Sequence, residues 1–259
     1  MNRQPVVAGV FYPVNTQQLH QMLNQYLKDA ETDAKVPKAI IAPHAGYIYS
    51  GPVAATAYAR LKQARHLITR VVIIGPSHRV AFKGLAVSRA ATFTTPLGKV
   101  PVDQKAVEEI ARLPFVEFLE NAHTYEHSLE VHLPFLQETL TEFNIVPIVA
   151  GDASPEQVAQ VIDMLWGGEE TLIVISSDLS HYHDYETAKQ LDQATSEIIE
   201  KHQYESLLYE SACGKVPLSG LLKVAREKLL SIKTIDLRNS GDTAGDKSRV
   251  VGYGAYVIE

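Results

Sequence analysis

The sequence predicts an α/β fold with a mainly parallel sheet, and three observations carry that prediction. Four short apolar runs rich in β-branched residues alternate with longer stretches of helical periodicity. The apolar runs are continuous, which is typical of strands that helices cover on both faces. Hydrophobic residues make up 46% of the chain and charged residues 21%, so a large core can be buried.

The four buried strands are expected at Lys38–Ala42, Arg70–Ile74, Ile145–Ala150 and Thr171–Ser176. The segments between them are long enough for the crossover helices that parallel neighbours require. Helices are expected at Thr16–Ala30, Pro52–Arg65, Asp103–Arg112, Ser128–Phe143, Pro155–Leu165, Tyr185–His202 and Leu218–Leu230. Asn15 or Thr16 can cap the first of these helices, and Ser154 with Pro155 marks the start of another.

Two further segments have β character. Short alternating pieces between Phe82 and Val102, around Pro96-Leu97-Gly98, predict a β-hairpin, and Arg249–Val257 alternates enough to be a final strand. The chain has 259 residues and neither repeats nor a linker, so we expect one domain over residues 1–259.

Charge and cysteine content exclude several classes of protein. A net charge of -6 and a pI of about 5.9 disfavour nucleic acid and acidic membranes as partners. The longest apolar runs are far shorter than the roughly 20 residues that span a bilayer. Cys213 is the single cysteine, and the first residues do not resemble a signal peptide, so a cytoplasmic location is expected.

Histidine and aspartate side chains follow all four predicted strands. These residues are His44, His78, Asp152, Asp178 and His181. In open α/β sheets, ligands bind beyond the carboxyl ends of parallel strands, so side chains from several strand ends converge there. Each residue alone has a structural explanation, as a hydrogen-bonded histidine or a helix-capping aspartate. Their coincidence at four strand ends favours one polar, metal-binding pocket.

A second polar cluster, Tyr125–Phe135, begins the fourth predicted helix. His127 lies at the expected helix start, where it can point into the pocket, and Glu126 lies beside it. Glu130 and His132 fit a solvated helix face equally well. His127 and His132 are five residues apart and so do not form the H-E-x-x-H zinc motif.

Several motifs resemble those of the Memo family. They are Ala8-Gly9-Val10-Phe11-Tyr12-Pro13, Pro43-His44-Ala45-Gly46-Tyr47-Ile48-Tyr49-Ser50-Gly51, Gly75-Pro76-Ser77-His78, Thr95-Pro96-Leu97-Gly98, the cluster from Glu126 to Pro134, Ser176-Ser177-Asp178-Leu179-Ser180-His181, and Cys213-Gly214. The resemblance spans nearly the whole chain. It implies a three-layer α/β/α sandwich around a central mixed, mainly parallel sheet, similar to the fold of the class III extradiol ring-cleavage dioxygenases.

The resemblance also implies roles for individual residues. His44 and His78 match metal-site histidines, and His181 matches the acid/base histidine, with Asp178 orienting or assisting it. Asp242 is the expected third metal ligand by its position before the last strand. Further pocket candidates are Tyr47, Glu126, His127 and Asp152. Cys213 is expected to pack, not to bind metal.

Two histidines and a carboxylate suit Fe(II) with open coordination positions, and Zn(II), Cu or Mn(II) are alternatives. Three hypotheses follow: a dioxygenase-like redox enzyme of unknown substrate, a metal-dependent hydrolase, or a non-catalytic protein that binds a peptide or small molecule. For the third, Tyr12, Tyr47, Tyr49, Tyr125 and Tyr182 are candidates to line a cleft. The resemblance further suggests a radical S-adenosylmethionine protein as a partner.

Overall fold

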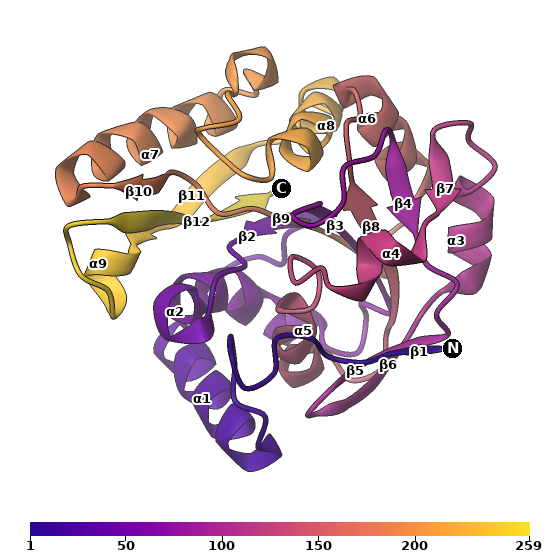
Figure 1. The fold of residues 1–259 in the computed structure, drawn as a ribbon, viewed down its shortest axis with the longest axis horizontal. Coiled ribbons are helices and arrows are strands. Elements are labelled where there is room, and N and C mark those ends of the chain that lie inside the picture. The colour runs from indigo at the N-terminus through magenta and orange to yellow at the C-terminus, as the bar shows by residue number, and fades with distance from the viewer.

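In the computed structural model, which describes residues 1–259, a nine-stranded mixed sheet lies between two layers of helices (Figure 1). Its strands are β2 (Ala39–Ala42), β3 (Arg70–Pro76), β4 (Leu85–Val87), β7 (Val116–Phe118), β8 (Asn144–Ala150), β9 (Thr171–Ser176), β10 (His181–His183), β11 (Ile232–Asn239) and β12 (Val250–Ile258). The strand order is β10-β12-β2-β9-β3-β8-β4-β7, and β11 pairs with β12. The predicted three-layer α/β/α sandwich is confirmed.

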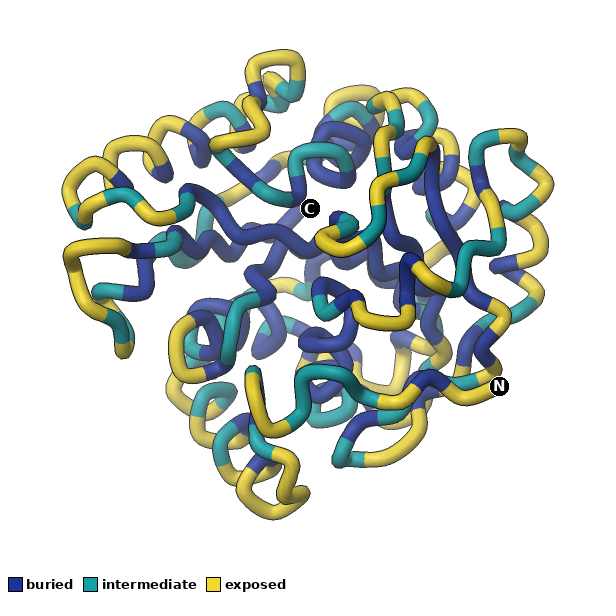
Figure 2. Tube along the Cα trace, viewed as in Figure 1, coloured by how far each residue is buried: buried dark blue, intermediate teal, exposed yellow.

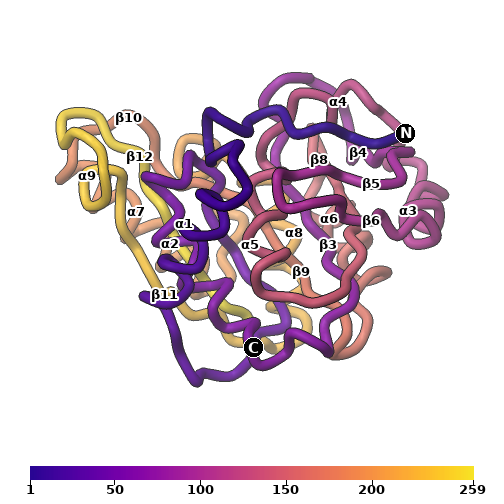
Figure 3. Tube along the Cα trace, turned by 90° about the horizontal axis from the view of Figure 1, so that it is seen from below, coloured from indigo at the N-terminus to yellow at the C-terminus, as the bar shows by residue number.

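Helices cover both faces of this sheet (Figures 1 and 3). One layer holds α6 (Pro155–Met164), α7 (Tyr185–Glu200) and α8 (Lys215–Glu227). The other holds α1 (Thr16–Asp29), α2 (Tyr47–Tyr58) with the 3₁₀ helix Ala59–Ala64, and α5 (His132–Thr139). The remaining helices are α3 (Gln104–Ile110), α4 (Glu120–Thr124), the 3₁₀ turn Tyr204–Ser206, and α9 (Ser240–Thr243). None of these helices is long and apolar enough to cross a membrane.

The four strands predicted from apolar runs are the four parallel neighbours β2, β9, β3 and β8. Their residues are buried along almost their whole length, and they form the centre of a core of 67 buried side chains (Figure 2). Ala42 pairs with Ser176, and Pro76 pairs with Ala150, so the strands end level with one another. The residues that follow them therefore share one edge of the sheet.

The predicted hairpin forms, but in a separate sheet. β5 (Thr92–Thr95) and β6 (Gly98–Pro101) are antiparallel, and β1 (Asn2–Arg3) adds to β5 in parallel. The sequence did not predict β11, because its residues are mostly half-buried and polar ones such as Lys233 and Asp236 interrupt the apolar pattern.

Three predicted helix starts were wrong, including that of α8, which begins at Lys215 and not at Leu218. α2 begins at Tyr47, five residues before the predicted Pro52, and contains that proline in its second turn. α5 begins at His132, not at Ser128. The segment before α5 stays irregular because its backbone groups bond to side chains: the N–H groups of His127 and Ser128 both donate to the Glu126 carboxylate.

A buried ion pair fastens the N-terminal segment to this irregular loop. Arg3 donates to Glu130 over 2.7 Å, and both side chains are buried. The Glu130 carboxylate also accepts from the N–H groups of Val6 and Val7 and from the hydroxyl of Tyr12. Glu130 is thus a buried anchor and not part of a solvated helix face.

We expect Glu130→Ala to lower the free energy of unfolding by about 3–5 kcal/mol, because it leaves a buried guanidinium without its charge partner. Urea denaturation measures the change. The exposed Glu117 is the matched control, and Glu117→Ala should change stability by less than about 0.5 kcal/mol. Equal effects of the two substitutions would show that the Arg3–Glu130 pair does not anchor the N-terminal segment.

Candidate metal centre

His44 follows β2 and is held in one tautomer by two serines. Its Nδ1 lies 2.6 Å from the Ser176 hydroxyl, which donates its proton to the Ser128 carbonyl, also over 2.6 Å. The hydroxyl must therefore accept from His44, so Nδ1 carries the ring proton and Nε2 carries the lone pair. Burial holds the pKa of His44 well below its usual value, so the ring is neutral.

His78 follows β3 and is oriented by a buried carboxylate. Glu126 accepts from the His78 Nδ1–H over 2.9 Å and from the His78 backbone N–H over 2.6 Å. Because a carboxylate only accepts, Nδ1 of His78 carries a proton, and in the neutral ring Nε2 presents the lone pair. Burial acts to raise the pKa of Glu126, but the hydrogen bonds from His78 and from the backbone outweigh it and lower that pKa to about 2.

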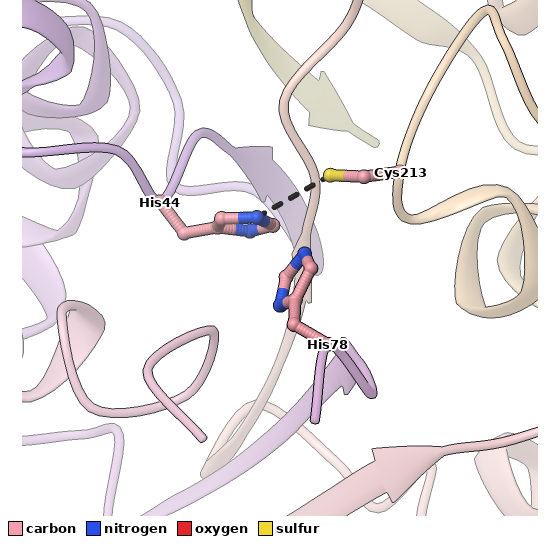
Figure 4. A group of neighbouring side chains, drawn as sticks. All are labelled: His44, His78 and Cys213. Carbon is pink, nitrogen blue, oxygen red and sulfur yellow. Dashed lines mark hydrogen bonds between the residues drawn. The ribbon is translucent and has the colours of Figure 1, made fainter. Parts of the chain in front are cut away.

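Cys213, which the sequence analysis set aside as a packing residue, completes a three-residue group. Its Sγ lies 3.3 Å from the Nε2 of His44 (Figure 4), and the ligand atoms of His44, His78 and Cys213 all lie within 4.8 Å of one another. Figure 4 shows both rings and the thiol turned toward one space. Burial raises the pKa of the thiol, so a metal would have to displace its proton.

Gly214 explains how Cys213 reaches this position. A Cβ at residue 214 would lie 2.5 Å from the carbonyl oxygen of Ser176, at the end of β9. Only glycine allows so close an approach of the two backbones. In the sequence, the pair Cys213-Gly214 is therefore the feature that could have indicated this candidate ligand.

Asp178 lies beside the group, and His181 is close enough to affect the pKa of His44. Oδ1 of Asp178 accepts from the His44 backbone N–H over 2.7 Å, and Oδ2 lies 3.9 Å from the His44 Nε2. Burial raises the pKa of Asp178 to about 6, although hydrogen bonding and neighbouring histidines oppose the shift. His181 Nδ1 lies 2.8 Å from the Leu179 carbonyl, so in the neutral ring Nε2 is the free acceptor.

The other pocket candidates differ in where they lie and in what they contact. His127 stacks on His78 with ring centroids 4.6 Å apart, and burial lowers its pKa to about 4. Tyr47 is buried and donates to the Val131 carbonyl, so its hydroxyl is already used. Asp152 is exposed after β8 and lines a cavity of about 340 Å³ whose wall also contains Cys213.

Asp242, the expected third ligand, does not lie with the two histidines. It belongs to neither group of neighbouring metal-ligating side chains, which are His44, His78 and Cys213, and His78, Glu126 and His127. Its carboxylate instead caps the short helix α9 through the backbone N–H of Asn239 and accepts from the Tyr185 hydroxyl. Capping therefore explains an acceptor side chain at that position.

Comparison with known proteins gives matches over nearly the whole chain. The family model described as Memo-like protein matches residues 3–257. The chain belongs to the Memo-like family. It is 38% identical to a MEMO1 family protein of Aquifex aeolicus, and 97% of each chain is covered. Proteins of the same name from Methanosarcina acetivorans and Thermotoga maritima are 37% and 36% identical, over 99% and 100% of both chains.

One more histidine of this Memo-like chain is buried outside the centre. His132 starts α5, and its Nδ1 lies 2.8 Å from the Tyr58 hydroxyl, whereas Nε2 has no partner. Burial lowers the pKa of His132 to about 3. The folded state therefore requires the neutral ring.

This burial predicts acid sensitivity. His132 takes up a proton near pH 6.5 in the unfolded chain but only near pH 3 in the folded chain. The stability that is present above pH 6.5 is therefore lost as the pH falls from about 6.5 to about 3. His132→Gln should reduce the slope of unfolding free energy against pH by about 1.4 kcal/mol per pH unit within this range. Urea denaturation at several pH values measures the slope, and His66→Gln, at an exposed histidine, is the control. An unchanged slope in His132→Gln would contradict the assignment.

Proposed function

We propose that the protein is a metal-dependent redox enzyme whose metal is held by His44, His78 and Cys213. The observation that carries the proposal is the convergence of two imidazole Nε2 lone pairs and one sulfur within 4.8 Å. Each imidazole is fixed from behind, by Ser176 or by Glu126. Such supporting contacts set the tautomer and orientation of histidine ligands in metal sites.

The donor set fits a transition metal of the iron, copper or zinc kind. Thiolate and imidazole are ligands for these metals, whereas manganese(II) favours oxygen donors, so this set makes Mn(II) the weakest of the four alternatives. We favour iron(II). A bound redox metal would supply electron transfer to or from a substrate, which the side chains cannot supply themselves.

The chain's own residues supply proton transfer. Asp178 holds a carboxylate oxygen 3.9 Å from the His44 Nε2, and its pKa of about 6 allows it to release and regain a proton near neutral pH. His181 offers a free Nε2 on the neighbouring edge strand. The two residues can therefore accept protons from a substrate next to the centre.

Oxygen consumption tests the redox chemistry. Protein reconstituted with iron(II) without oxygen should consume oxygen with a member of a catechol panel, and the zinc-loaded protein should not. Equal oxygen consumption by the zinc-loaded protein would contradict a redox role for the metal. The absence of turnover with iron across the panel would remove support for the dioxygenase-like reaction.

The ligand set is tested by metal content. Wild-type protein should bind one transition metal ion per chain, and Cys213→Ser should weaken binding by at least tenfold, because the hydroxyl is a poorer ligand than the thiolate. Asp242→Ala should leave affinity unchanged. Competition with a chelator and metal analysis give the affinities. Loss of metal from Asp242→Ala, with Cys213→Ser unaffected, would restore the carboxylate as third ligand.

Glu126 is expected to tune the centre without binding the metal. Glu126→Gln keeps the size of the side chain but removes its charge, and should lower metal affinity by about 10- to 100-fold through the orientation of His78. Circular dichroism checks that the variant folds. Affinity equal to wild type would mean that this carboxylate does not control the His78 ring.

A further inference from the structure

Tyr253 lies at the metal centre, although it follows no parallel strand. β12 is antiparallel to β2, with Tyr256 opposite Ile41, and continuing that register places Tyr253 level with His44. Further along the same side of β12, the backbone of Gly252 exchanges two hydrogen bonds of 2.8 Å with Leu179 and Ser180, while β11 pairs along the other side. Tyr253 therefore stands where β12 passes from the segment that carries His44 to the segment that carries Asp178.

The hydroxyl of Tyr253 has no partner in the protein. The residue is only 1% exposed, and its hydroxyl makes no hydrogen bond. The hydroxyl oxygen is not fully enclosed by protein atoms, so the small remaining exposure of Tyr253 lies at that oxygen. Other buried tyrosines are satisfied: Tyr256 bonds Ser196 over 2.7 Å, and Tyr58 bonds His132. Buried tyrosine hydroxyls normally find a partner, so this one is available to a ligand.

The surroundings of this hydroxyl indicate the kind of ligand. Burial raises the pKa of Tyr253, and the nearby Asp178 carboxylate raises it further, so the hydroxyl keeps its proton and donates. Tyr49 and Tyr182 lie close enough to affect that pKa, and they are 36% and 64% exposed, so they offer accessible aromatic surface nearby. The guanidinium of Arg249 lies 4.9 Å from the centre of the Tyr182 ring and adds a positive charge there.

The backbone at Tyr182 is unusual. Its φ of 64° lies in the left-handed region, which a bulky side chain rarely adopts, and the pairing of β10 with β12 is irregular between His181 and His183. A bulge of this kind turns a side chain away from its regular direction. Strained residues of this type concentrate at ligand-binding sites.

We propose that Tyr253 is a ligand-binding residue, whose hydroxyl donates a hydrogen bond to the carboxylate of a small aromatic acid bound beside the metal centre. Tyr49 and Tyr182 flank the ring of the acid. The inference rests on the proposed metal-dependent function. The negative charge of Asp178 repels the carboxylate of the acid, and the divalent ion, together with Arg249, offsets that charge.

Benzoate is the probe, titrated calorimetrically into the full chain loaded with zinc, which is inert to redox. Tyr253→Phe removes only the hydroxyl and should raise the Kd for benzoate about tenfold, the effect of losing one hydrogen bond to a charged group. Tyr256→Phe is the matched control on the same strand. It should leave that Kd unchanged but lower the Tm, because its hydroxyl bonds Ser196.

Two further readouts separate the alternatives. Tyr253→Phe should keep the Tm of wild type, since its hydroxyl bonds nothing in the protein; a clear fall in Tm would mean a structural role and would overturn the proposal. Benzamide has the shape of benzoate without its charge and should bind wild type more weakly. Equal affinities would contradict the carboxylate.

Metal content, measured first on each variant, distinguishes failure of this inference from failure of the proposed function. A wild-type chain that binds no metal removes the function on which the inference rests. If metal binds stoichiometrically but benzoate does not bind wild type, or binds Tyr253→Phe equally tightly, the ligand assignment is wrong and the metal centre stands.

Discussion

The buried carboxylate of Glu126 links the two histidines of the centre. It accepts from the ring and backbone of His78, and it also accepts from the N–H of Ser128. The Ser128 carbonyl in turn receives the Ser176 proton, which leaves Ser176 to accept from the His44 ring. One carboxylate therefore fixes the orientation of His78 directly and that of His44 through two serines, and the geometry of the centre depends on its burial.

In the proposed metal centre, the same contacts orient both histidine rings before any metal binds. A neutral imidazole must present its lone pair to be a ligand, and both rings already do so at Nε2. Burial keeps His44 neutral, whereas the fixed hydrogen bonds keep Glu126 ionised. Their different surroundings thus keep His44 uncharged and Glu126 charged. Binding of a metal would therefore require little rearrangement of these side chains.

The sequence predicted the layers and the edge that holds the centre, because continuous apolar runs identify covered parallel strands and their ends are visible as polar residues. The start of α5 was placed too early, since the apolar spacing of Leu129 and Leu133 does not reveal that nearby backbone groups bond to side chains. Asp242 was chosen by its distance from the last strand, and that position serves a helix cap.

Cys213 was not among the predicted metal ligands for a different reason. It lies in the connection between α7 and α8, far from any strand end in the sequence, so the rule that collected the histidines does not apply to it. Its approach depends on a backbone contact at Gly214 that side-chain patterns do not record.

The same limitation applies to Tyr253, and it follows from the mixed character of the sheet. Parallel strands bring their carboxyl ends to the ligand edge, but an antiparallel neighbour reaches that edge at its amino-terminal half. β12 runs against β2, so Tyr253 stands level with His44 near the beginning of its strand. In a mixed sheet, the residues that open an antiparallel strand beside the parallel core therefore belong to the candidate site as much as those that follow the parallel strands.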